Sequence, residues 1–456
     1  MTMLRHYAEW ACRLNYENLP VVAASNARKA IIDTIAAMLA GVNEPASRKI
    51  MAYVAREKAA GNASVTGSNC RFSTASAALI NGTMAHALDY DDLLTSTRSH
   101  PSAVLVPAVL AVGETLDASG AEILVAYLAG LELIDKIGSL AAFPQYAKGW
   151  HTTSTLGGLG AAAAASKLLK LPSAQMRMAV SIAASMAGGL QKNFGTMTKP
   201  LHAGLAAQSG VMAAMLAADG FTASDDVFAG KDNYLEVTAQ TVEPSSVPSF
   251  GAPFAVVSPG LHVKRYPCCF ATHRALDAIF FLRSEHPQLD VKQIKSVTCM
   301  APARSFTALI YDLPGTGLEG KFSMQYVVAA ALVDGCVNIG SFTDEKVGRK
   351  NLRLLMEKVG KVEDPNLAIT DPDGTDRRFT EVTVEIVNGQ VFQKRIVRPK
   401  GSVDVPLTEE EIAEKFLECS RGILSGTQPD TALNILRGLE SVNSISELMG
   451  SLRATS

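Results

Sequence analysis

Residues 157–171 read GGLGAAAAASKLLKL, and residues 203–218 read AGLAAQSGVMAAMLAA. Alanine and leucine are strong helix formers, and neither stretch shows the alternation of β-branched residues that is typical of strands. Ser, Gln, Lys and Gly interrupt both stretches well before the roughly 18–20 apolar residues of a membrane span accumulate. Both stretches are therefore predicted to be closely packed, buried helices.

The same composition extends over much of the chain. Alanine and leucine dominate from Val21 to about Gly220, with few β-branched alternations and no internal repeat of fixed period. The first two-thirds of the chain are therefore expected to be all-α. The expected helices cover residues 22–39, 73–88, 102–116, 122–140, 155–169, 173–189 and 200–218.

The composition changes at residues 243–260, where proline, serine and glycine predict a loop at a domain boundary. Residues 380–397 then alternate apolar and polar side chains around Asn388-Gly389, which predicts a β-hairpin with a type I′ turn. Residues 291–300 are expected to form a partner strand. This second region is therefore predicted to be α+β.

Helical composition returns near the end of the chain. Thr408 and Glu411 have the spacing of a capping box, which predicts a helix over residues 409–420. The α+β region would then be an insertion. We predict a mainly α fold with a large all-α helical domain (1–265), a smaller lid-like α+β domain inserted before the C-terminal helices (266–397), and a C-terminal segment (398–456) that returns to the helical domain.

The overall composition excludes several classes of protein. The 456 residues are 48% hydrophobic, which fits two or three domains with large interiors. Lys and Arg (42) nearly balance Asp and Glu (44), so we expect neither a nucleic-acid partner nor attraction to a membrane. Seven cysteines without CxxC spacing predict neither disulfides nor structural zinc. Charges within residues 1–20 argue against a secretory signal, so a cytoplasmic location is expected.

Three predicted helices begin with basic residues instead of the acidic residues that the helix dipole favours. His100 precedes the first, His151 precedes the second, and Lys199 opens the third, with His202 following. In the first and third, a proline is expected at the first helical position. Because free backbone N–H groups and a cation can together hold an anion, these helix starts predict a polycarboxylate site. Alternatively, each histidine satisfies only a local polar contact.

The segment HALDYDD at residues 86–92 ends one of the predicted helices. An i,i+3 spacing would stack His86 with Asp89, and Asp89 with Asp92. Such acids can orient a catalytic imidazole and fix its tautomer. The alternatives are a metal site and an acidic helix end in solvent. We find no second acidic metal motif downstream, so no metal is predicted.

The segment KRYPCCFATH at residues 264–273 lies at the predicted domain boundary. Its Lys264 and Arg265 can clamp a carboxylate, or they can form a solvated hinge. Nothing near Cys268 and Cys269 indicates a lowered thiol pKa, so covalent catalysis is not expected. The chain also lacks HExxH, P-loop and Gly-x-Ser-x-Gly motifs, and it has no convincing GxGxxG after a strand. Nucleotide-dependent and serine-hydrolase chemistries are therefore disfavoured.

Taken together, these segments resemble the MmgE/PrpD family, which includes 2-methylcitrate dehydratases, cis-aconitate decarboxylases and iminodisuccinate epimerases. The resemblance runs from end to end. It implies a large all-α domain, a smaller α+β domain, a homodimer, and a site without cofactor or metal in the cleft between the domains. The segments that carry it, in chain order, are HALDYDD (86–92), HPSAVLVPAVLAVGE (100–114), GWHTTSTLG (149–157), NFGTMTKPLHAG (193–204), KRYPCCFATH (264–273) and KFSMQY (321–326).

The resemblance also implies which residues line the site. His100 and His151 are expected to be the general acid and base, in an order left open. Asp89 is expected to orient an imidazole, and Tyr326 to donate a proton or position the substrate. The remaining expected site residues contact the substrate: Lys199 and Lys264 as carboxylate clamps, and His202, Asp92, Cys269 and His273 beside them.

Every reaction in this family can be built from moving a proton at a carbon beside a carboxylate. We expect a cofactor-independent hydro-lyase that acts on a small polycarboxylate of the 2-methylcitrate type, with an epimerase of an iminodisuccinate-like substrate as the alternative. Cys269 stands where we expect histidine in the decarboxylases, which argues against decarboxylation. The loop Leu93–Ser99 departs from the threonine-tryptophan pattern of several relatives. A non-catalytic helical scaffold that binds a partner protein is the remaining hypothesis.

Overall fold

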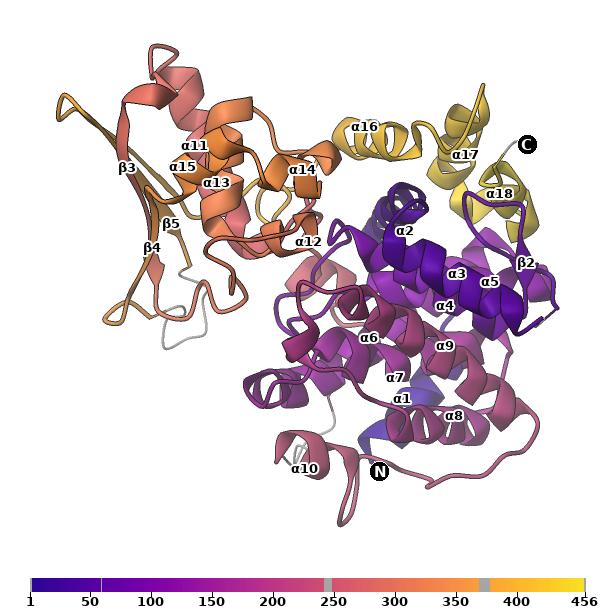
Figure 1. Cartoon of the computed structure of the whole chain (residues 1–456). Coiled ribbons are helices and arrows are strands. Elements are labelled where there is room, and N and C mark those ends of the chain that lie inside the picture. Colours follow the sequence, from indigo (N-terminus) through magenta and orange to yellow (C-terminus); the bar gives the residue numbers. More distant parts are fainter. Residues whose placement is uncertain (1, 59, 242–247, 369–377, 455–456) are drawn as a thin grey trace. The chain divides into compact units, whose positions relative to one another are not determined.

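The computed structural model describes residues 2–58, 60–241, 248–368 and 378–454. It divides into two compact units. The helical unit contains Met1–Val263 and Thr408–Ser456, and the α+β unit contains Lys264–Leu407. The predicted mainly α fold with a small α+β part is confirmed (Figure 1).

The helical unit is built from helices that come from both ends of the chain (Figure 1). Its helices are α1 (Met3–Arg13), α2 (Val21–Gly41), α3 (Pro45–Arg56), α4 (Thr74–Ala87), α5 (Ser102–Leu116), α6 (Gly120–Ala147), α7 (Thr152–Leu168), α8 (Ser173–Ser185), α9 (Thr198–Ala218), α10 (Tyr234–Ala239), α16 (Glu409–Ser420), α17 (Gln428–Arg437) and α18 (Ile445–Ser451). The capping box of Thr408 and Glu411 starts α16 as predicted.

Glycines allow the central helices to approach closely. A Cβ on Gly204 of α9 would lie 2.3 Å from the carbonyl oxygen of Leu79 in α4. A Cβ on Gly130 of α6 would lie 2.7 Å from the carbonyl oxygen of Gly160 in α7. Backbones this close exclude any larger side chain at these positions. The Ala- and Gly-rich stretches thus form the packed interior that their composition predicts.

By length and composition, α9 is the one described helix that could cross a membrane. It packs against α4, α7 and α8, however, and 56% of its most apolar window is buried within the protein. A core helix passes the same hydropathy test as a membrane span, so the apolar character of α9 is explained by its packing.

Several helix starts differ from the prediction. Helix α9 begins at Thr198, so Pro200 is its third residue rather than its first, and Pro101 precedes α5. In neither helix does the proline occupy the predicted first position. The first part of the chain is also not purely helical, because β1 (Ala63–Ser64) and β2 (Arg71–Phe72) form a small antiparallel pair.

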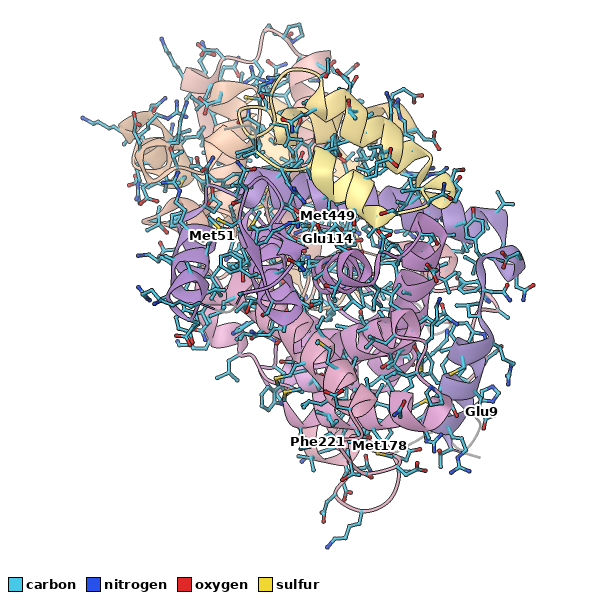
Figure 2. The ribbon with its side chains drawn as sticks, turned by 90° about the vertical axis from the view of Figure 1, so that its right-hand side faces the viewer. Glu9, Met51, Glu114, Met178, Phe221 and Met449 are labelled. Atoms are coloured by element: carbon cyan, nitrogen blue, oxygen red, sulfur yellow. The ribbon has the colours of Figure 1, made fainter. Side chains whose placement is uncertain are left out.

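Glu114 of α5 joins this β-pair to the C-terminal end of the chain (Figure 2). Its carboxylate accepts hydrogen bonds of 2.6 Å from both the backbone N–H and the hydroxyl of Ser64. It also forms ion pairs with Arg71 at 3.3 Å and with Arg453, which follows α18, at 3.7 Å. These contacts fix the C-terminal helices against α5 on the face where Figure 2 labels Met449.

The α+β unit contains a four-stranded sheet of order β4-β3-β5-β6. Helices α11 and α13 pack against its strands (Figure 1). Strand β3 pairs in parallel with β4 and antiparallel with β5, and β5 pairs antiparallel with β6. The elements are α11 (His273–Glu285), β3 (Ile294–Pro302), α12 (Gly317–Gly320), α13 (Met324–Asp334), α14 (Asp344–Val347), α15 (Lys350–Met356), β4 (Val359–Asp364), β5 (Thr380–Ile386) and β6 (Val391–Ile396).

The predicted hairpin forms from β5 and β6, but its turn type was predicted wrongly. The carbonyl of Ile386 accepts a hydrogen bond from the N–H of Gly389, and Ile386 N–H donates to the carbonyl of Gln390. Gly389 has φ +86°, whereas Asn388 is not among the residues with positive φ. A type I′ turn needs positive φ at both central residues. The loop is therefore a three-residue connection that ends in a left-handed glycine.

The predicted boundary segment 243–260 lies partly outside the described residues, because 242–247 are not described. Within its remainder, Val256–Gly260 forms a short helical turn, and Gly260 has φ +82°. The carboxylate of Glu132 in α6 accepts a backbone hydrogen bond of 2.8 Å from Gly251 and another from Ala255. This buried acid fixes the segment to the helical unit.

Candidate active site

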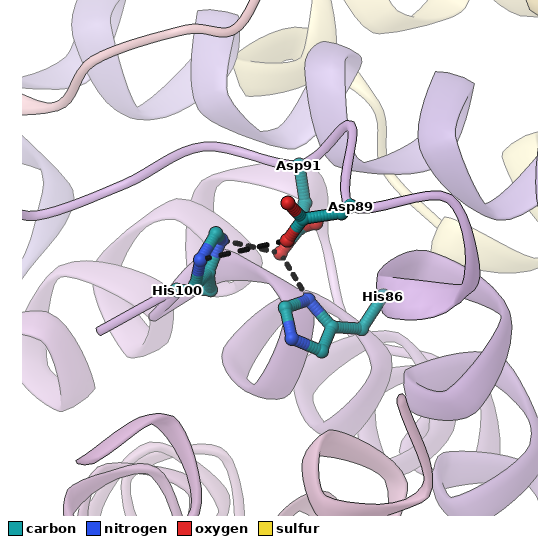
Figure 3. A group of neighbouring side chains, drawn as sticks. All are labelled: His86, Asp89, Asp91 and His100. Carbon is teal, nitrogen blue, oxygen red and sulfur yellow. Dashed lines mark hydrogen bonds and ion pairs between the residues drawn. The ribbon is translucent and has the colours of Figure 1, made fainter. Parts of the chain in front are cut away.

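Four imidazoles, two aspartates and one lysine gather inside the helical unit. His86 lies on the last turn of α4, and Asp89, Asp91 and His100 lie on the segment between α4 and α5 (Figure 3). The remaining members come from the starts of α7 and α9, and they are His151, Lys199 and His202.

The segment after α4 turns sharply and brings Asp91, rather than Asp89, to His86. Helix α4 ends at Ala87, and Asp89 has a left-handed φ of +53°. His86 Nδ1 lies 2.8 Å from Asp91 Oδ2. The predicted i,i+3 stacking is therefore wrong, because the helix ends before Asp89.

One oxygen of Asp91 contacts two histidines. Asp91 Oδ2 lies 2.8 Å from His86 Nδ1 and 3.1 Å from His100 Nδ1 (Figure 3). Burial raises the pKa of Asp91, but its interactions with His86 and His100 outweigh burial and hold the pKa of this carboxyl well below its usual value. An ionised carboxylate only accepts hydrogen bonds, so His86 Nδ1 donates to Asp91, and the contact with His100 Nδ1 is an ion-pair contact.

Lys199 lies on the other side of His86. Its Nζ is 2.6 Å from Asp89 Oδ1 and 2.8 Å from His86 Nε2. An ammonium group only donates, so His86 accepts at Nε2 and carries its proton at Nδ1. Burial, and to a smaller extent the nearby Lys199 charge, lower the pKa of His86 to about 4 despite Asp91. His86 is therefore neutral near pH 7.

His151 and His202 form a second imidazole pair. Their Nδ1 atoms are 3.0 Å apart, and the His151 ring meets Phe194 edge-on at 4.9 Å between centroids. Burial followed by the Lys199 charge lowers the pKa of His202 to about 4, and the same two causes lead in lowering that of His151. Both rings are neutral near pH 7, so one Nδ1 donates while the other accepts.

Asp92 is buried but lies against a different group. Its carboxylate accepts hydrogen bonds from the backbone N–H and the hydroxyl of Ser102, the first residue of α5. The Ser102 hydroxyl also lies 2.7 Å from Tyr127 Oη. Burial raises the pKa of Asp92 well above its usual value, and the neighbouring charges of Asp33 and Asp91 raise it further. The structure thus places Asp92 at the start of α5 rather than against the imidazoles.

The other predicted site residues belong to the α+β unit. Lys264 is buried, and the N–H of Cys269 donates to the carbonyl of Lys321 at 3.0 Å. His273 is fully buried, with Nε2 3.3 Å from the carbonyl oxygen of Cys268. The hydroxyl of Tyr326 donates to the carbonyl of Ser341, and burial raises its pKa to about 12. The roles predicted for these four residues stay predictions.

His86, Asp89, Asp91 and His100 could also hold a metal ion, because one ligand atom from each lies within 4.8 Å of the others. The donor set suits a divalent cation in its chemistry. The Lys199 ammonium, however, already contacts both Asp89 Oδ1 and His86 Nε2. A metal bound through either atom would have to displace this positive charge or face it at close range. The arrangement of these four residues is therefore better explained by their contacts with the Lys199 ammonium group than by a bound metal ion.

A cavity of about 810 Å³ lies elsewhere in the helical unit. Cys12, Tyr16, Glu122 and Lys167 are among the residues that line it. In the described part of the chain, none of the predicted site residues lines this cavity. We therefore locate the candidate site by its buried ionisable groups rather than by this volume.

Asp91 and His86 are not among the site residues that the sequence predicts. The motif HALDYDD contains both, so the signal was present. A helix continued through Leu88 and Asp89 would place Asp89, rather than Asp91, beside His86. The left-handed φ of Asp89 decides the geometry, and no residue type in the motif requires it, although aspartate tolerates that conformation better than most residues.

Comparison with known proteins gives matches along nearly the whole chain. The model of the MmgE/PrpD N-terminal domain matches residues 5–246, and that of the MmgE/PrpD C-terminal domain matches residues 266–440. The human cis-aconitate decarboxylase is 31% identical over 83% of this chain and 79% of its own length. A cis-aconitate decarboxylase-like protein of Aspergillus oryzae is 27% identical over 96% and 95% of the two chains. The Aspergillus terreus cis-aconitate decarboxylase is 25% identical over 96% and 94%.

Proposed function

The chain belongs to the MmgE/PrpD family, and on that premise we propose that it is a cofactor-independent hydro-lyase that removes a proton next to a carboxylate of a small polycarboxylate. The observation that carries this proposal is the shared contact of Asp91 Oδ2 with His86 and His100. An ionised aspartate behind an imidazole orients the ring and stabilises the imidazolium that forms when the ring acts as a general base.

His100 is the proposed base. Its side chain is 11% exposed, whereas that of Asp91 is fully buried and that of Lys199 is 5% exposed. With Nδ1 next to Asp91, Nε2 is the atom through which a neutral His100 would accept a proton. After this atom takes a proton, the imidazolium lies between Asp91 at 3.1 Å and Asp89, whose Oδ1 is 3.9 Å from Nε2. Both carboxylates stabilise the charged form.

Lys199 is the proposed partner of the substrate carboxylate. Removing a proton beside a carboxylate develops enolate-like charge on its oxygens, which a fixed ammonium group stabilises. Lys199 is in the first turn of α9, so the helix dipole adds positive potential at the same place. Asp89 and His86 orient the ammonium group before substrate arrives. Lys264 is proposed as a second carboxylate clamp, as the resemblance implies.

In the proposed reaction, His100 alone takes the proton from the substrate and gives it back to the leaving group. His100 Nε2 takes the proton from the carbon beside the carboxylate. The C–O bond at the adjacent carbon then breaks, and its electron pair leaves with the hydroxyl group. The His100 imidazolium returns the proton to that hydroxyl, so water leaves, a carbon–carbon double bond forms and the enzyme regains its starting state.

Two other reactions of the same family remain as alternatives. An epimerase needs a second acid or base on the opposite face of the carbon, and the neutral His151–His202 pair provides a candidate. Decarboxylation is supported by the names of the relatives, which are 25–31% identical. Cys269 argues against decarboxylation if histidine is needed at that position, as the resemblance implies.

Proton NMR of the purified protein with candidate substrates separates the three reactions. Citrate, 2-methylcitrate, cis-aconitate and iminodisuccinate would each be added without metal. A hydro-lyase forms an unsaturated acid from a hydroxy acid without losing carbon dioxide. An epimerase exchanges the α-hydrogen in deuterium oxide without a new vinyl signal, and a decarboxylase releases carbon dioxide from cis-aconitate. Turnover of none of the four compounds would refute the proposal.

A further inference from the structure

A buried lysine from the C-terminal part of the chain reaches the segment that carries the site. Lys415 lies on α16, and its Nζ donates a 2.8 Å hydrogen bond to the carbonyl oxygen of Tyr90. The same ammonium group is 2.6 Å from Asp33 Oδ1 on α2, and it lies 3.7 Å from the centroid of the Tyr90 ring. The side chains of Lys415 and Asp33 are 4% and 0% exposed.

Tyr90 is the residue between the two aspartates that organise the site. Asp89 precedes it and contacts Lys199, and Asp91 follows it and contacts both His86 and His100. A carbonyl held at this position fixes the direction of the peptide plane that joins Tyr90 to Asp91. The backbone of Asp91, whose N–H belongs to that plane, therefore depends on where the Tyr90 carbonyl lies.

Asp89 adds a local reason for external support. Its φ of +53° is in the left-handed region, which is uncommon for residues other than glycine. Such a conformation persists only where surrounding contacts hold it. The Lys415 hydrogen bond to the next residue is one such contact.

A buried ion pair is a weak source of stability, because burying both charges costs about as much as their attraction returns. The pair of Lys415 and Asp33 is thus poorly explained as a stabilising contact alone. We propose that Lys415 is a positioning residue, which acts through the Tyr90 carbonyl to keep Asp91 directed at His86 and His100. The proposal rests on the proposed function for its kinetic consequence, but its structural consequence can be measured without substrate.

Two variants separate positioning from stability. Lys415→Met removes the ammonium group and leaves the buried Asp33 carboxylate without this counter-charge, so Tm should fall. The double variant Asp33→Asn/Lys415→Met removes both charges and should recover most of the Tm. In both variants kcat should fall by about tenfold to a hundredfold with little change in KM, because small misplacements of catalytic groups have large effects on rate. Recovery of kcat together with Tm in the double variant would show a purely structural role and overturn the proposal.

Arg28→Met is the matched control. Arg28 lies on α2, as Asp33 does, and its Nη1 forms a 2.6 Å ion pair with Glu440. This variant should lower Tm without lowering kcat. A fall in kcat equal to that of Lys415→Met would mean that any loss of stability slows the enzyme, which would overturn a specific role for Lys415.

Imidazole NMR of the protein labelled with nitrogen-15 histidine, without ligand, gives a second readout. The proton between His86 Nδ1 and Asp91 should shift or exchange faster in both Lys415 variants, and it should be unchanged in Arg28→Met. Unchanged imidazole signals in Lys415→Met would overturn the proposal. If no candidate polycarboxylate is turned over, the proposed function fails, yet these signals still decide the role of Lys415.

Discussion

His100 Nδ1 lies 3.1 Å from Asp91 Oδ2, which makes Asp91 the carboxylate that orients the proposed base. Asp91→Asn should lower kcat by roughly a hundredfold to ten-thousandfold, the range typical of general acid–base catalysis. An amide cannot stabilise the imidazolium as a carboxylate does. Steady-state kinetics on the substrate found by NMR would measure the change.

Asp92→Asn is the control for that substitution. Asp92 lies against Ser102 rather than against the imidazoles, and an amide has nearly the same shape as a carboxyl group. Most of the activity should remain. Equal losses in the two variants would contradict the assignment of Asp91 as the orienting residue.

The neutral histidines predict how stability changes with pH. His86 and His202 have folded-state pKa values lowered from 6.5 to about 4. Because the folded state binds fewer protons, the stability that these groups contribute is present above pH 6.5 and is lost as the pH falls toward 4. Tm measured by calorimetry should therefore fall steadily between these two pH values. A constant Tm across that window would contradict the buried neutral assignment.

Removal of the Lys199 ammonium group should weaken both binding and turnover of the polycarboxylate. In the wild-type protein, a polycarboxylate at one hundred times its Kd should raise the free energy of unfolding by ~2.7 kcal/mol and therefore raise Tm. Lys199→Met should abolish this rise in Tm. It should also lower kcat/KM, because the stabilising charge for the enolate is lost. A thermal shift that persists in Lys199→Met would show that the anion binds elsewhere.

The position of Lys199 beside Asp89 and His86 also predicts that no metal is needed. Dialysis against EDTA should leave the activity and the Tm of the protein unchanged. Loss of activity on chelation, with recovery on adding back one divalent cation, would assign the four-residue cluster to a metal instead.

We propose α9 as a surface of the homodimer that the resemblance implies. Leu205, Met212 and Met215 lie on one side of the helix and are 42–44% exposed. A repeated apolar stripe of this kind is typical of a helix that packs against another surface. The double variant Leu205→Glu/Met212→Glu should be monomeric by light scattering, whereas Val237→Glu, at an exposed position on α10, should leave the oligomeric state unchanged. A dimer that survives the double variant would place the interface elsewhere.

Short sequence motifs predicted the start of α16 and the position of the β5–β6 hairpin. The capping box at Thr408 fixed the start of α16, and the alternation around Asn388-Gly389 located the hairpin. The prediction of the turn type was wrong because Asn-Gly fits both a two-residue and a three-residue connection. The register of β5 against β6 selects between these two connections.

The site was predictable in its residue types and less so in its pairings. Basic residues at helix starts identified His100, His151 and Lys199, which the structure brings to one cluster with His86. The pairing of His86 with Asp91 depends on the left-handed turn at Asp89, and the Tyr90 carbonyl beside that turn accepts a hydrogen bond from Lys415, which is 325 residues beyond Tyr90. Contacts between residues so far apart leave no periodic pattern in the sequence.

Hydrogen exchange into the substrate tests the central claim most directly. The wild-type protein and His100→Gln would each be incubated in deuterium oxide with the polycarboxylate that the protein turns over, and proton NMR would follow the hydrogen next to the carboxylate. The account predicts that the wild-type protein removes this hydrogen and that His100→Gln does so at least about a hundredfold more slowly. Equal rates in the two proteins, or turnover without loss of that hydrogen, would contradict it.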